Sequence, residues 1–68
     1  DAYFNRGFLY QSMGQHDKAL ADYNMVIQLE PDYADPYAYR AALYELMGQQ
    51  GEALADYNMV IQLRPDSA

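Results

Sequence analysis

Apolar and polar positions follow the period of an α-helix along most of this chain. Tyr3, Gly7 and Tyr10 fall at spacings of three and four residues, which places them on one face of a helix. The stripe is interrupted at Gly14, a residue typical of helix ends, and a second stripe then runs until Pro31 stops it. The members of the second stripe are Ala19, Tyr23, Val26 and Ile27. The pattern predicts two short helices joined by a tight turn.

The same pattern occurs a second time in the other half of the chain. The segment ALADYNMVIQL stands at Ala19–Leu29 and again at Ala53–Leu63, and pairing residues 1–34 with residues 35–68 gives 22 identities in 34 pairs. Chance would give about two. A fixed period of this length is typical of solenoids, in which each unit stacks on the next. We therefore expect an all-α fold of four antiparallel helices in one domain, 1–68, with repeat one at 1–34 and repeat two at 35–68.

Polar residues add details about helix starts and exposed faces. The connection EPDYADPY offers Asp35 as an N-cap and Pro36 as the first helical residue, where a missing N–H costs nothing. Asp22 and Asp56 lie opposite the apolar stripe of their helices. We expect both carboxylates to be solvated, as most helical carboxylates are.

Composition excludes several classes of partner. Four basic side chains against ten acidic ones give a net charge of −6, which argues against binding to nucleic acid or to an anionic membrane. No apolar run is long enough to cross a bilayer. The acidic balance fits a soluble protein whose copies repel one another at long range. Because the chain opens without methionine, we expect a piece of a longer protein or an engineered sequence.

These residues resemble the tetratricopeptide repeat, a helix–turn–helix unit of about 34 residues. The resemblance covers the whole chain, in two copies that are in phase. It departs from the family at Tyr3 and Tyr37, where tryptophan is usual, and at Arg6 and Arg40, where leucine is usual. The matching positions are Tyr3, Gly7, Tyr10, Gly14, Ala19, Tyr23 and Pro31 in the first copy, and Tyr37, Ala41, Tyr44, Gly48, Ala53, Tyr57 and Pro65 in the second.

The resemblance implies a non-catalytic scaffold that binds a peptide or a protein in a concave groove lined by the first helix of each unit. Fold alone names no partner. The positions expected to face the groove are Phe4, Asn5, Phe8, Gln11 and Ser12 in the first unit, and Ala38, Tyr39, Ala42, Glu45 and Leu46 in the second.

Phe4 and Phe8 are one helical turn apart and allow two interpretations. They form an aromatic contact patch for a partner, or they pack against the neighbouring unit. We expect packing for Phe8 and the interface for Phe4. Some relatives bind acidic C-terminal peptides through a carboxylate clamp of Lys and Asn, and here Phe4 and Phe8 occupy the positions of its first Lys and Asn. The clamp is therefore absent, and Glu45 would repel an acidic peptide.

The last helix suggests a second function. In a solenoid each unit covers the apolar face of its neighbour, and the sequence predicts no cover for Tyr57, Val60 and Ile61. The alternative to a peptide-binding scaffold is thus a structural module that self-associates, either by head-to-tail stacking or by pairing of the last helices. Exchange of helices between chains is a third arrangement.

Enzymatic chemistry has little support in the sequence. His16 is the only histidine and stands next to Asp17 in the predicted turn, where we expect it to be solvated. A catalytic role needs a constellation of groups rather than one side chain. The carboxylates do not have the spacing of a metal site, and no glycine-rich phosphate loop is present. We expect no enzyme activity, no metal and no cofactor.

Overall fold

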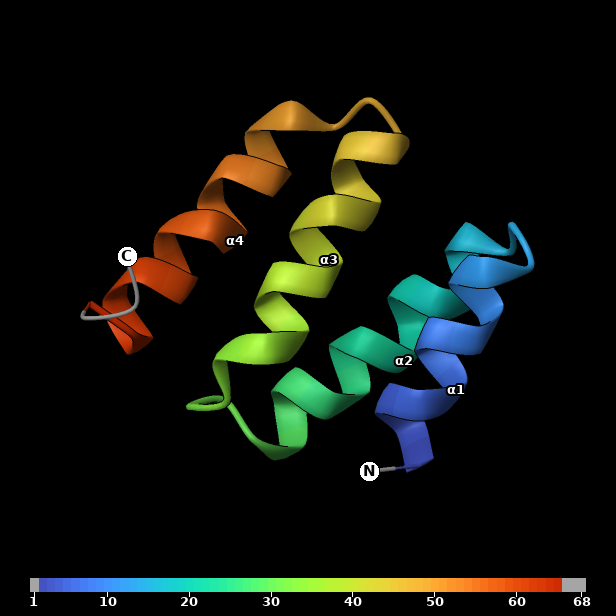
Figure 1. Cartoon of the computed structure of the whole chain (residues 1–68), viewed down its shortest axis with the longest axis horizontal. Helices are drawn as coiled ribbons and strands as arrows, with labels where there is room; N and C mark the ends of the chain where they lie inside the picture. The colour runs from blue at the N-terminus through green and yellow to red at the C-terminus, as the bar shows by residue number, and fades with distance from the viewer. Residues whose placement is uncertain (1, 66–68) are drawn as a thin grey trace.

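Four helices make up the computed structural model, which describes residues 2–65. They are α1 (Ala2–Ser12), α2 (His16–Leu29), α3 (Ala34–Leu46) and α4 (Gln50–Leu63). Each helix runs antiparallel to the next, and α3 lies between α2 and α4 (Figure 1). The described range contains no strand, so the predicted all-α architecture is confirmed. The outer ends of the two predicted repeats, residues 1 and 66–68, lie outside that range.

Both helix pairs turn through the same glycine-based cap. Gly14 has a φ of 78°, in the left-handed region that favours glycine. Its N–H donates to the carbonyl of Gln11 at 3.0 Å, while the N–H of Gln15 donates to the carbonyl of Tyr10 at 2.9 Å. The same two bonds recur around Gly48, which has a φ of 77°. The cap satisfies the last carbonyls of α1 and α3 and directs the chain back along the preceding helix.

The third helix begins earlier than its sequence indicates. Its N-cap is Tyr33, and Asp35 and Pro36 both lie inside the first turn. The prediction of Asp35 as the N-cap was therefore wrong. The carboxylate of Asp35 instead accepts a hydrogen bond from Arg64 at 2.7 Å, which ties the end of α4 to the start of α3.

The core forms where α3 packs on α2. Ala19 and Tyr23 of α2 are fully buried together with Leu43 of α3. Gly7 of α1 is also buried and lets the Tyr23 ring approach closely. A Cβ atom at position 7 would lie only 2.9 Å from Cε1 of Tyr23.

Two aspartates expected in solvent are buried instead. Asp22 and Asp56 are each only 4% exposed. Each accepts two hydrogen bonds from an arginine on the preceding helix: Arg6 donates to Asp22 at 2.7 and 2.8 Å, and Arg40 donates to Asp56 at 2.6 and 2.7 Å. The prediction of solvated carboxylates was wrong because a bidentate guanidinium replaces the water that each would lose on burial. The aspartate raises the pKa of its arginine through that hydrogen bond, so both guanidinium groups stay charged.

The two helical glycines without a positive φ should respond oppositely to alanine. Gly7→Ala should lower the free energy of unfolding by about 1–3 kcal/mol, because the new methyl group meets the Tyr23 ring. Gly51→Ala should raise it by up to about 1 kcal/mol, because nothing lies within 4 Å of a Cβ at that position. Urea unfolding followed by circular dichroism measures both changes, and a shift of the same sign in both variants would contradict this packing.

Replacement of Arg40 by leucine, the residue that the resemblance implies at this position, should destabilise this chain. Arg40→Leu leaves the buried Asp56 without its two donors, and we expect a loss of about 2 kcal/mol or more. The double variant Arg40→Leu, Asp56→Ala should lose clearly less than the sum of the two single variants, because no unpaired charge then remains buried. Urea unfolding of all four proteins tests this, and simple additivity would contradict a coupled pair.

Candidate functional site

An aromatic cluster joins α1 to α3 on one side of the molecule. The ring of Phe4 meets the rings of Tyr23, Tyr33 and Tyr39 edge-to-face, with centroids 5.9, 6.0 and 5.0 Å away. Such geometry adds about 0.5–1.5 kcal/mol per pair beyond area burial. Phe4 is half-buried and packs against the core cluster. Its main role is thus to hold the two helices together.

Phe8 has the more open position of the two phenylalanines. Its side chain is 53% exposed, and its ring meets that of Tyr39 edge-to-face at a centroid distance of 5.9 Å. This order is the reverse of our expectation, which placed Phe4 at the surface and Phe8 in the packing. The reason is that two rings pack against Phe4, Tyr39 of α3 and Tyr33 at the N-cap of α3.

A hollow of about 410 Å³ opens beside these rings. We call it the α1–α3 hollow. Its walls are mainly aromatic and aliphatic, with one amide side chain. The residues that line it are Phe4, Asn5, Phe8, Leu9 and Tyr39. Four of these five positions were expected from the sequence to face the groove, and Leu9 was not. Leu9 recurs as Leu43 in the second unit, where the side chain is fully buried.

The other predicted groove positions fall into two groups. Some side chains have partners within the protein: Gln11 accepts from the Tyr23 hydroxyl at 2.7 Å, Ser12 donates to the Phe8 carbonyl at 3.1 Å, and Glu45 accepts from the Tyr57 hydroxyl at 2.6 Å. Leu46 is exposed, whereas Ala38 and Ala42 are half-buried. The structure does not bring these side chains into the α1–α3 hollow with Phe8.

Tyr23 and Tyr57 have raised pKa values for different reasons. Burial raises the pKa of Tyr23 to about 12, with smaller contributions from Tyr39 and Asp22. The hydrogen bond to Glu45 raises the pKa of Tyr57. Both phenols therefore remain neutral donors near neutral pH, and neither is poised for proton transfer.

Most of the basic side chains are already engaged. Arg6, Arg40 and Arg64 each form an ion pair with an aspartate at 2.6 or 2.7 Å. The Lys18 ammonium lies over the ring of Tyr10, 5.6 Å from its centroid. An approaching anion therefore meets cations that are already partly neutralised, on a chain whose net charge is negative.

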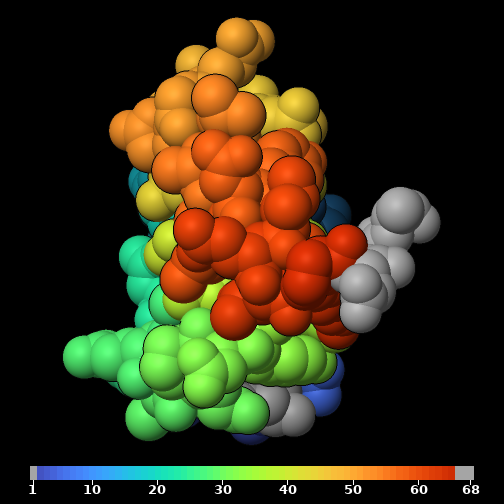
Figure 2. Space-filling view, turned by 90° about the vertical axis from the view of Figure 1, so that its left-hand side faces the viewer, coloured from blue at the N-terminus to red at the C-terminus, as the bar shows by residue number. Residues whose placement is uncertain are grey.

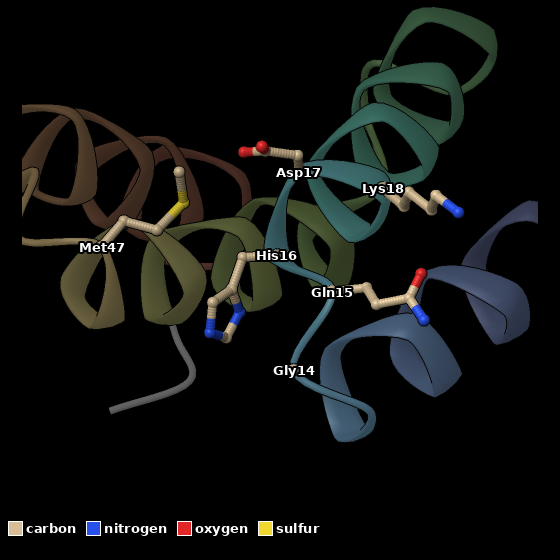
Figure 3. A pocket seen from close by; sticks show the side chains of 6 residues that line it. All are labelled: Gly14, Gln15, His16, Asp17, Lys18 and Met47. Carbon is tan, nitrogen blue, oxygen red and sulfur yellow. The ribbon is translucent and has the colours of Figure 1, made fainter.

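His16 lies in a separate hollow between the two turns. This space of about 440 Å³ is lined by Gly14, Gln15, His16, Asp17, Lys18 and Met47. His16 is the first residue of α2 and is half-buried rather than solvated, and its Nδ1 is buried without a hydrogen-bond partner in the described structure. Figure 3 shows the side chains of His16, Asp17 and Lys18 pointing in different directions. The histidine is thus not oriented by its neighbouring carboxylate.

Within residues 2–65, no three His, Cys, Asp or Glu side chains come together as a metal site. None of the four described helices is long and apolar enough to span a bilayer.

Part of the apolar face of α4 is exposed among the residues that the structure describes. Tyr57 is 37% exposed, Ile61 is exposed and Val60 is half-buried. The side of the molecule that carries α4 faces the viewer in Figure 2, where α4 forms much of the surface.

Comparison with known proteins identifies the family. One family model described as a tetratricopeptide repeat matches residues 1–33, and a second model with the same description matches residues 23–55. The second match spans the junction between α2 and α3. Sequence comparison with curated proteins gives no significant match. Tetratricopeptide repeats generally mediate protein–protein interactions, and proteins of the family are typically non-catalytic. With both matches on the same repeat type and four helices in the expected order, the chain belongs to the tetratricopeptide repeat family.

Proposed function

We propose that this chain is a non-catalytic interaction scaffold that binds a peptide or protein segment through the α1–α3 hollow. The observation that carries the proposal is the ring of Phe8, 53% exposed beside an apolar space of about 410 Å³. Aromatic side chains in concave, largely apolar sites are enriched among the residues that dominate binding energy. The space is large enough for one aromatic or branched aliphatic side chain of a partner.

The floor of the hollow is held in place before any partner arrives. Phe4 lies against three tyrosine rings, and Tyr39 contacts Phe8 as well as Phe4. Ordering of interface side chains is one of the costs of association. Because these rings already contact one another, less side-chain ordering is needed when a partner binds. This lower cost supports a function in binding.

Charge indicates the kind of segment that would bind. The Glu45 carboxylate lies on the same helix as Tyr39, and the arginines are engaged with aspartates. Complementary charge steers association and disfavours the wrong partners. We therefore expect an apolar anchor flanked by neutral or basic residues, and we do not expect an acidic C-terminal peptide.

Selection from a random peptide display library tests the proposal. Enriched peptides should carry an aromatic or branched aliphatic anchor with lysine or arginine nearby. Phe8→Ala should lower their affinity at least tenfold, about 1.4 kcal/mol, because it removes one wall of the hollow. Fluorescence anisotropy of labelled peptides gives the affinities.

A matched control separates loss of the hollow from loss of fold. Leu29→Ala removes a similarly exposed apolar side chain outside the hollow and should leave affinity unchanged. Alanine is compatible with position 8, since Ala42 occupies the same place in the second unit. Selected peptides that bind Phe8→Ala as tightly as the parent chain would refute this site, and consistently acidic peptides would refute the charge argument.

A structural, self-associating module is the second candidate function. The exposed apolar side chains of α4, including Tyr57 and Ile61, favour it. Phe8 lines the α1–α3 hollow and lies outside α4, so the Phe8→Ala variant distinguishes the two functions: it should weaken peptide binding without changing the association state.

A further inference from the structure

Identical segments on α2 and α4 are buried to different extents. Tyr23 is 0% exposed, whereas Tyr57 at the same position of the repeat is 37% exposed. Leu20 packs against the core, whereas Leu54 is 62% exposed. Because Ala19–Leu29 and Ala53–Leu63 have the same sequence, the difference comes from the neighbour: α3 covers α2.

The cover over α2 has an identifiable centre. Leu43 of α3 is 0% exposed and forms the core cluster with Ala19 and Tyr23. Beside it, Nη1 of Arg40 donates to the side-chain oxygen of Asn24 at 2.8 Å. Two contacts therefore define the junction between the two units. We call the Leu43 side chain the knob and the hydrogen bond from Arg40 to Asn24 the tether.

An equivalent hollow lies on α4, and no residue between 2 and 65 fills it. A hollow of about 320 Å³ opens there, and we call it the α4 socket. It is lined by Glu45, Gln50, Ala53, Leu54 and Tyr57. Ala53 and Tyr57 correspond to Ala19 and Tyr23, the two residues that hold Leu43 in the first unit. Asn58 stands where Asn24 receives the tether.

The matching knob lies at the other end of the same chain. Leu9 of α1 occupies the repeat position of Leu43, yet it is 59% exposed instead of 0%. Arg6 occupies the position of Arg40, and its side chain is 56% exposed where that of Arg40 is 19% exposed. The residues that α3 uses to cover α2 are thus displayed on α1, and none of the described helices covers them.

We propose that a second copy of this chain docks head-to-tail, with its α1 on the α4 of the first copy. Leu9 of one copy enters the α4 socket of the other, and Arg6 donates to Asn58 while keeping its bond to Asp22. The contact reproduces the α2–α3 junction one unit further along the solenoid. Because the two surfaces differ, it leaves a free knob and a free socket at the ends, so copies add in an open chain.

The junction between copies lacks one feature of the internal junction. Tyr39, which binds the Phe4 and Tyr23 rings, has Asn5 at its position on α1, and Phe4 has Ala38 at its position on α3. The ring contacts are therefore missing between copies, and the net charge of −6 adds repulsion. Association should be weak, should grow from micromolar to millimolar protein, and should strengthen with added salt, which screens the repulsion.

Sedimentation velocity with two blocked variants tests the proposal. Leu9→Glu removes the knob, and Leu54→Glu removes the apolar wall of the socket. Each variant alone should remain monomeric, because each lacks one of the two surfaces. An equimolar mixture should form dimers and nothing larger, because one intact knob meets one intact socket and the remaining ends carry glutamate on both sides.

Control and gain-of-association variants sharpen the result. Leu29→Glu places the same charge on a side chain that stays exposed although its helix is covered, so it should associate like the parent chain. Asn5→Tyr restores the missing ring and should tighten association several-fold. Helical circular dichroism of every variant checks that it is folded.

Three outcomes would overturn the proposal. A parent chain that is monomeric at millimolar concentration in high salt has no such junction. Dimers of Leu9→Glu alone would mean tail-to-tail pairing of α4, and dimers of Leu54→Glu alone would mean head-to-head pairing of α1. The Phe8→Ala variant should associate normally, so failure of peptide binding and failure of stacking are separate results.

Discussion

The packing of Leu43 against Ala19 and Tyr23 is the contact on which the rest of this structure depends. It joins the second helix pair to the first and leaves α3 covering α2. With α3 in that place, Tyr39 reaches the phenylalanines of α1, and the α1–α3 hollow has its second wall. A junction this small has few redundant contacts, since a chain of 68 residues buries only a modest core. The proposed binding surface and the stability of the fold therefore depend on the same apolar contact.

Two ion pairs between arginine and a buried aspartate support this packing. Arg6 and Arg40 stand where relatives usually have leucine, and each is matched by a buried aspartate on the following helix. A buried ion pair adds less stability than a well-packed apolar pair, but removing one partner costs much more. Each pair thus links the first helix of a unit to the second helix of the same unit. Arg40 also reaches Asn24 across the junction, so the second pair helps to set the register between the units.

The sequence predicted the helices, their pairing and the repeat, because 3.6-residue periodicity and a fixed period are local signals. It did not predict the burial of Asp22 and Asp56, since a charged residue opposite an apolar stripe is usually solvated. A signal was present nonetheless, because both units place an arginine and an aspartate at the same separation along the chain. No pattern in the sequence indicated which of Phe4 and Phe8 is the more buried. Their exposure depends on where Tyr33 and Tyr39 lie, and these residues are far away along the chain. Leu9 shows the same limit, since an identical repeat position is core in one unit and surface in the other.

Leu9 also connects the two proposed uses of the molecule. It lines the α1–α3 hollow, and in the proposed stacking it enters the α4 socket of another copy. An anchor that touches Leu9 in the hollow changes the free energy of docking a second copy, and by linkage the second copy changes the affinity for the anchor by the same factor. Whether the anchor strengthens or weakens docking of the second copy depends on where it places the Leu9 side chain. An anchor that displaces Leu9 from its docking position competes with stacking, whereas one that packs behind it favours stacking. Because one side chain would serve both surfaces, the two proposed uses are coupled through Leu9.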